Sequence, residues 1–169
     1  MSKPRLRELR DEEYRVLEEF AEKLGLKLSD IASNPMALEV PRAKYIDLFD
    51  VPAEIQLILR YFDTHYSAGL YIGYIEGNML KPGLQLARKL AVKCSREIKC
   101  IKLTWSGEKK FLYGRIVRGE EDIIEWVEGL RVVINPLGEP LGWGEGIEKA
   151  NIKIVKPVRD LGWYLRRGG

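Results

Sequence analysis

The stretch Leu141-Gly142-Trp143-Gly144-Glu145-Gly146-Ile147 alternates glycine with larger residues. Because successive side chains of a β-strand point to opposite faces, a strand here places its three glycines on one face and Leu141, Trp143 and Ile147 on the other. Glycine weakens a strand, so this spacing indicates that a backbone or a ligand comes close to the main chain. We expect the larger residues to face the core and a neighbouring element to crowd the glycine face.

The glycine run does not fit a dinucleotide-binding loop. That fingerprint needs GxGxxG in a turn between a strand and a helix, and Ile147 stands where its third glycine belongs. We therefore predict no cofactor, and we keep the close approach of RNA to the glycine face as an open alternative.

Regular spacing of apolar residues predicts alternating helices and strands up to about residue 95. Helices are expected at 11–24, with Asp11 as its N-cap and Gly25 as its stop, after Pro52 to about residue 62, and at 84–93. Short strands are expected at 36–40, 45–49 and 69–76. This part, residues 1–95, is predicted to be a mixed α/β domain.

Near residue 96 the sequence pattern changes to short segments of alternating apolar residues. Strands are expected at 100–105, 130–134, 141–147 and 151–155, with a short helix ending at 111–114 and a helical turn at 161–167. Periodicity leaves residues 122–127 unassigned. The predicted fold class is therefore α+β, with residues 96–169 forming a small β domain.

Positive charge gathers at the end of the chain. The net charge is only +3, but six cations and a single carboxylate follow residue 148. Lys153 alternates with Ile152 and Ile154, so we expect the isoleucines in the core and Lys153 on the outer face of the strand. A local excess of cations is typical of a phosphate-binding surface. The candidate residues are Lys149, Lys153, Lys156 and Arg159.

No catalytic or metal-binding pattern stands out. His65 is the only histidine and is expected at the surface or at a helix end, since it has no partner for general base chemistry. Cys94 and Cys100 form no CxxC pair, and we expect free cysteines packed in the core of a protein of the reducing cytosol. The N-terminus shows no apolar signal core, and no apolar span is long enough for a membrane.

Several motifs resemble those of the PUA RNA-binding domain. They are Phe111-Leu112-Tyr113-Gly114, Leu130-Arg131-Val132-Val133-Ile134 and Pro140-Leu141-Gly142-Trp143-Gly144. The ending Asp160-Leu161-Gly162-Trp163-Tyr164-Leu165-Arg166 and the opening Leu9-Arg10-Asp11-Glu12-Glu13-Tyr14-Arg15-Val16 are similar to the Nip-seven family of large-ribosomal-subunit biogenesis factors. The resemblance covers nearly the whole chain.

The resemblance implies an N-terminal α/β domain joined to a PUA pseudo-barrel, with no catalysis. It further implies RNA binding by the C-terminal domain, often to single-stranded uridine-rich RNA, and a role in precursor rRNA processing alongside other assembly factors. Lys149, Lys153 and Lys156, with Arg159, are the positions that correspond to the family's basic surface. The implied location is the cytoplasm of an archaeal cell, or the nucleolus of a eukaryote.

Stacking of bases would need exposed aromatic rings, for which Tyr113 and Trp143 are candidates, although Trp143 shares a face with expected core residues. Two other functions stay open. An RNA-modifying enzyme is conceivable because PUA domains are often appended to such enzymes, yet about 95 residues are few for a catalytic domain. A protein-protein adaptor would show an exposed apolar patch around residues 11–24 or 53–62.

Overall fold

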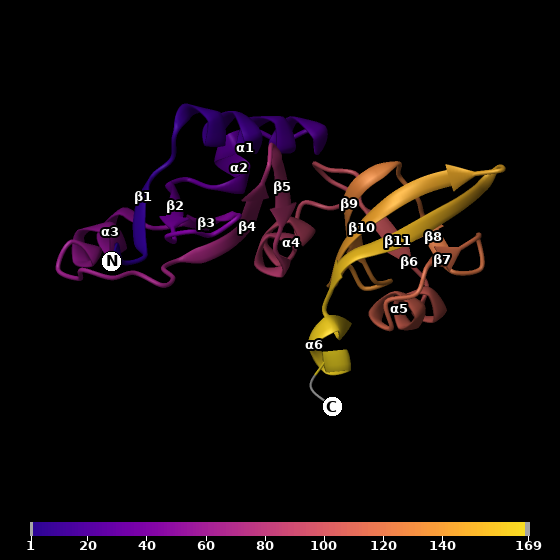
Figure 1. The fold of residues 1–169 in the computed structure, drawn as a ribbon. Coiled ribbons are helices and arrows are strands. Elements are labelled where there is room, and N and C mark those ends of the chain that lie inside the picture. Colours follow the sequence, from indigo (N-terminus) through magenta and orange to yellow (C-terminus); the bar gives the residue numbers. More distant parts are fainter. Residues whose placement is uncertain (1, 168–169) are drawn as a thin grey trace. The chain divides into compact units, whose positions relative to one another are not determined.

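The computed structural model describes residues 2–167, and its contacts group the chain into two units, residues 1–86 and 87–169 (Figure 1). The division falls within α4 (Leu84–Ala91). A mixed unit is followed by a β-rich one, as predicted. The exact domain boundary near residues 95 and 96 stays a prediction.

Unit 1 is built on an antiparallel sheet with the strand order β1-β2-β3-β4-β5. The predicted strands and the first helix are confirmed, while β1, β5 and α2 were not predicted. The elements of this unit before α4 are β1 (Arg5–Glu8), α1 (Asp11–Lys23), α2 (Leu28–Ile31), β2 (Pro35–Glu39), β3 (Ile46–Asp50), α3 (Ala53–Leu59), β4 (Leu70–Glu76) and β5 (Met79–Pro82).

Helix α1 packs through the apolar stripe that its sequence shows. Leu17, Phe20 and Ala21 are buried, and Gly25 follows the helix in a left-handed conformation (φ 73°), as expected of a helix stop. The N-cap is Arg10 rather than Asp11. The Glu13 carboxylate accepts from the Arg10 backbone N–H at 2.8 Å, which is the contact that the third helical residue makes in a capping box.

His65 is buried and binds the end of helix α3, so the predicted position at a helix end is confirmed and the predicted surface position is wrong. Its Nδ1 accepts from the Leu6 backbone N–H at 3.0 Å, and its Nε2 lies 2.9 Å and 3.1 Å from the Leu59 and Phe62 carbonyl oxygens. Nε2 therefore donates to these carbonyls. The ring is buried because it joins the edge strand β1 to the segment after α3, a long-range role that local sequence cannot reveal.

Unit 2 carries a six-stranded sheet with the order β7-β11-β10-β9-β6-β8, in which only β6 and β9 are parallel. The unassigned segment 122–127 contains strand β8. The elements are β6 (Ile101–Leu103), α5 (Trp105–Leu112), β7 (Val117–Arg118), β8 (Ile123–Glu125), β9 (Gly129–Ile134), β10 (Pro140–Lys149), β11 (Ile152–Asp160) and α6 (Gly162–Arg167).

The glycine run lies in β10, and its crowding neighbours belong to the same unit. A Cβ on Gly142 would lie 2.1 Å from the Arg159 carbonyl oxygen, and one on Gly146 would lie 2.0 Å from that of Val127. A Cβ on Gly144 would press into core side chains of the barrel, among them Val133 at 2.7 Å. The prediction of a neighbouring element is confirmed, and it leaves no room for RNA on this face.

The glycines of β10 face the core of unit 2. Large side chains from neighbouring elements occupy the volume above them. This core comprises Ile101, Leu103, Phe111, Val117, Ile123, Val133, Leu141 and Val155. Leu141 joins it because a register shift between Pro140 and Gly142 turns its side chain inward. Trp143 is fully buried on the face opposite the glycines, as predicted, but the barrel core lies on the glycine side, contrary to the expectation that the larger residues face it.

Cys94 and Cys100 form a disulfide, so the prediction of two free cysteines is wrong. Their Cα atoms lie 5.5 Å apart across the short loop between α4 and β6. Five residues separate the two cysteines, and this spacing matches no motif that predicts a disulfide.

Among residues 2–167, no helix has both the length and the apolar character that crossing a membrane requires.

Candidate nucleic-acid interface

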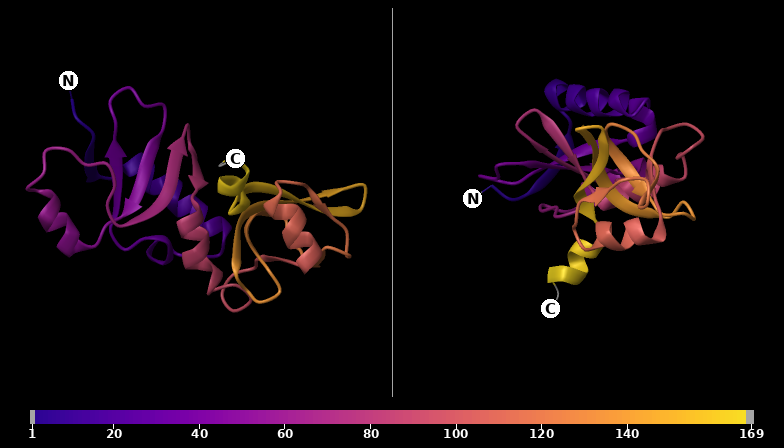
Figure 2. Two further views of the ribbon diagram at one scale, coloured as in Figure 1. Left: turned by 90° about the horizontal axis from the view of Figure 1, so that it is seen from below. Right: turned by 90° about the vertical axis from the view of Figure 1, so that its right-hand side faces the viewer.

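The predicted basic residues lie on one long hairpin, formed by β10 and β11. Ala150 and Asn151 connect the strands with φ values of 49° and 63°, which is the geometry of a tight hairpin turn. The tip of the hairpin lies at the opposite end of unit 2 from α6 (Figures 1 and 2). Both strands are longer than predicted. Only the two turn residues separate them, where the sequence predicts a gap over residues 148–150.

The two faces of β11 are reversed relative to the prediction. Val155 is fully buried and pairs with Val117 of β7, so it sets the inward phase of the strand. Ile152 and Ile154 point the other way, and Ile152 is half exposed. We call this side, away from Val155, the outer face; it carries Glu145, Ile147, Lys149, Ile152, Ile154 and Lys156 of the hairpin.

The reversal separates the predicted lysines. Lys149 and Lys156 are exposed on the outer face, where Lys156 stands directly opposite Glu145. Lys153 is exposed as well, but it projects from the other side of the strand, with its ammonium 5.4 Å from the centroid of the Trp126 ring. Trp126 donates from its indole nitrogen to the Ile154 carbonyl oxygen at 3.1 Å, so the ring is fixed and holds Lys153 in place.

Arg159 pairs with Trp143 across the hairpin and is half-buried. Its guanidinium carbon lies 5.9 Å from the centroid of the Trp163 ring. This arginine therefore lies on the far part of the hairpin from Lys149, beyond a register shift between Trp143 and Gly144. The structure thus brings Lys149 and Lys156 to one face and leaves the other two predicted residues apart.

Arg118 is a candidate that sequence reasoning missed. It is exposed on β7 and stands directly opposite Ile154, so it shares the outer face with Lys149 and Lys156. Among the described residues, none of these three cations forms an ion pair. Only the pairing of β7 with β11 brings Arg118 here, and a two-residue strand has no signal in the sequence.

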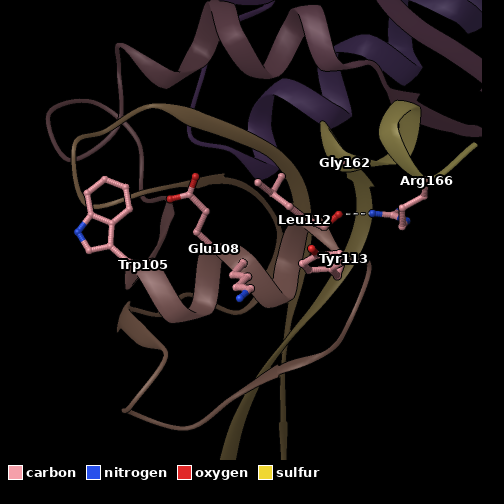
Figure 3. A pocket seen from close by; sticks show the side chains of 7 residues that line it. Trp105, Glu108, Leu112, Tyr113, Gly162 and Arg166 are labelled. Atoms are coloured by element: carbon pink, nitrogen blue, oxygen red, sulfur yellow. Dashed lines mark hydrogen bonds between the residues drawn. The ribbon is translucent and has the colours of Figure 1, made fainter. Parts of the chain in front are cut away.

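A pocket of about 600 Å³ lies beside α5 and the start of α6 (Figure 3). Trp105 and Tyr113 stand at the two ends of α5, with Glu108 and Leu112 between them. Both rings are more than half exposed, at 57% and 58%. Exposed aromatic rings beside a hollow are suited to stacking on nucleic-acid bases.

Glu108 has an unusual environment at this pocket. Burial raises the pKa of its carboxyl, and the nearby Glu139 charge raises it further, while a hydrogen bond with Asn135 acts in the opposite direction. Its Oε2 atom is buried and has no hydrogen-bond partner among the described residues.

The motif at residues 160–166 holds the C-terminal end of α5 in place. Asp160 is buried, and its carboxylate accepts from the Arg166 guanidinium at 2.9 Å and 3.1 Å. Arg166 also donates to the Leu112 carbonyl oxygen at the helix end, the contact drawn in Figure 3. A Cβ on Gly114 would lie 3.1 Å from the same guanidinium. Two distant motifs of the resemblance are therefore parts of one local structure.

Residues 99–169 match the UPF0113 PUA domain family. The six-stranded sheet, the helix after its first strand and the long basic hairpin agree with this match, so the protein has a C-terminal PUA domain, a class that suggests RNA binding.

Comparison of the whole chain leads to the family. It is 41% identical over 169 residues to a UPF0113 protein of Aeropyrum pernix, covering all of this chain and 96% of that protein. The chain belongs to the UPF0113 family. A crystal structure of a hypothetical protein from the hyperthermophilic archaeon Pyrococcus horikoshii OT3 shares the fold, with a TM-score of 0.59 and 12% identity over 95% of this chain and 99% of that one.

Proposed function

We propose that this protein is a non-catalytic RNA-binding factor of ribosome biogenesis, acting on precursor rRNA of the large subunit. The observation that carries the proposal is the outer face of a PUA domain on which Arg118, Lys149 and Lys156 form no ion pair among the described residues, although Glu145 stands directly opposite Lys156. Cations in this state are available to phosphates, whereas paired ones must first be released.

Phosphates and bases would be bound at different places in this account. The outer face of the hairpin binds the backbone, with Arg159 and Lys153 contributing less because aromatic rings hold their charges. Tyr113 and Trp105 provide exposed rings for bases of single-stranded, uridine-rich RNA. Trp143 has no exposed surface and drops out as a stacking partner.

The assignment to ribosome assembly rests on the similarity of the opening and closing motifs to the Nip-seven family. Crosslinking of the protein to RNA in cells, followed by sequencing, tests it. We expect enrichment of precursor rRNA of the large subunit. Enrichment of transfer RNA would instead point to an accessory subunit of a modification enzyme.

Catalysis is tested separately. Incubation of the full chain with RNA and a methyl donor, followed by nucleoside analysis, is expected to yield no modified base. A methylated nucleoside or pseudouridine in the product would establish an RNA-modifying enzyme and remove the non-catalytic proposal.

A protein-protein role for unit 1 is favoured by an exposed apolar surface on and after α3. Helix α3 has no buried residue, and Tyr61 is 88% exposed. The other exposed members are Ile55, Leu57, Ile58, Phe62 and Tyr66. An apolar surface of this kind is typical of docking sites, and another ribosome assembly factor is the expected occupant.

The α3 surface can be tested with Leu57→Glu/Phe62→Glu. We expect this variant to lose assembly factors that co-purify with the wild-type protein while it keeps its RNA affinity. Equal recovery of those factors with both proteins would contradict the docking role.

A further inference from the structure

A basic hollow lies on unit 1. It has a volume of about 540 Å³ and opens between β1, the start of α1 and the loop after β2. Five cations line it, with Glu39 as the one carboxylate of the lining; the cations are Lys3, Arg5, Arg7, Arg10 and Arg42. Residues 1–86 contain 11 Lys or Arg and 14 Asp or Glu, so the charge here opposes that of the unit as a whole.

Arg7 lines this hollow and is held in place by two carboxylates. Its guanidinium donates to both oxygens of Glu13, at 2.8 Å and 2.9 Å, and to Glu39 Oε2 at 2.9 Å. Arg10 lies 3.6 Å from the other Glu39 oxygen. The nearby carboxylates are therefore already engaged in holding Arg7 and Arg10 in place.

The remaining cations are available to a ligand. Lys3, Arg5 and Arg42 are exposed, and among residues 2–167 none of them forms an ion pair. Arg42 has a φ of 65°, a conformation that a side-chain-bearing residue rarely adopts, in the loop between β2 and β3. The loop thus holds a cation at the rim of the hollow.

An aromatic ring completes the hollow. Tyr45 is 48% exposed, and its ring centroid lies 5.3 Å from that of Tyr74, at an angle of 57° between the planes. Guanidinium groups match phosphate oxygens in a forked geometry, and an exposed, supported ring suits a base. An acidic peptide would use the cations and leave the ring without a planar partner.

We propose that this hollow of unit 1 binds single-stranded RNA, with Arg5, Arg42 and Lys3 on phosphates and Tyr45 on a base. The proposal rests on the proposed RNA-binding function and adds a second contact surface to that of the PUA domain. It gives the N-terminal unit a direct part in recognition, next to its role as a docking module.

The test compares Arg5→Ala/Arg42→Ala with Arg15→Ala/Lys27→Ala in the full chain. The control pair removes the same charge from exposed sites of the same unit that do not line the hollow. Binding of a labelled 20-nucleotide oligouridine is followed by fluorescence anisotropy over a range of salt concentrations. The slope of log K against log salt should become shallower by about 1.4 in the test pair, since each phosphate contact on a single strand contributes about 0.7.

Photocrosslinking gives an independent readout. An oligonucleotide containing 4-thiouridine should crosslink to the peptide that carries Tyr45, and the Arg5→Ala/Arg42→Ala variant should lose this crosslink. Equal slopes for the two pairs, or a wild-type crosslink map that lacks residues 40–46, would overturn the inference. RNA binding that depends on Lys149 and Lys156 but not on Arg5 and Arg42 would leave the proposed function intact, whereas a wild-type chain that binds no RNA removes both.

Discussion

Gly146 is the residue of the hairpin with least room for a side chain, since a Cβ there would lie 2.0 Å from a carbonyl oxygen that cannot move away cheaply. Gly146→Ala should lower the free energy of unfolding by about 3 kcal/mol, as expected for overpacking. Glu145→Ala, one residue away and exposed, should change it by less than about 0.5 kcal/mol. Urea unfolding measures both, and equal midpoints would contradict the crowding seen at this strand.

Glu108 provides a pH-dependent test at the candidate interface. Because the pKa of its carboxyl is raised in the folded chain, the fold prefers the protonated form and loses stability as pH rises from the unfolded value of about 4.3 through the raised one. Glu108→Gln should therefore raise the melting temperature at pH 7 and change it little at pH 4. A lower melting temperature at both pH values would contradict the raised pKa.

Single residues also show where sequence reasoning stops. The alternation in β11 predicts that Lys153 is exposed, as it is, but assigns the wrong residues to the core, because Val155 and not the isoleucines fills it. When a basic strand has apolar residues on both of its faces, alternation alone does not tell which face is buried. The neighbouring strands decide this. His65 and Arg118 depend in the same way on pairing with distant segments.

At the scale of elements, α5 and α6 are coupled through Asp160 and Arg166. Asp160→Asn weakens the ion pair and should release Arg166 from the end of α5. Hydrogen exchange at the backbone amides of α6 should then accelerate, while exchange in β9 stays unchanged. Unaltered exchange in α6 would show that the ion pair does not hold this helix.

The disulfide tests the loop between α4 and β6. Thiol titration of the unfolded, unreduced protein should find no free thiol. Reduction should lower the free energy of unfolding by about 2 kcal/mol, the value expected from closing so short a loop. Two reactive thiols in the freshly purified protein would contradict the bond.

Most elements with strong local signals were predictable, and the short ones were not. Helix α1 and strands β4 and β10 have clear periodicity and turn residues at their ends. Strands β1, β7 and β8 have four residues or fewer, so their existence depends on the sheets that they join. Helix α3 was predicted from an apolar side that the structure leaves exposed, because a docking surface and a core face share one pattern.

For the whole molecule, the overall fold class and the PUA character followed from sequence, and the binding surface did so only in part. The basic end of the chain led to Lys149 and Lys156, but the structure adds Arg118 and a basic hollow on unit 1. Charge counts along the chain conceal this hollow, since the cations at residues 3–10 are followed at once by the acidic helix α1 and Arg42 is distant from them in sequence.

The central claim is that RNA binds to the outer face of the PUA hairpin. The most direct measurement is the salt dependence of oligouridine binding by the wild-type protein and by Arg118→Ala/Lys149→Ala/Lys156→Ala. With about 0.7 per phosphate contact, the slope of log K against log salt should become shallower by about two in the variant. An unchanged slope, with affinity retained, would contradict the account and place the RNA elsewhere on the molecule.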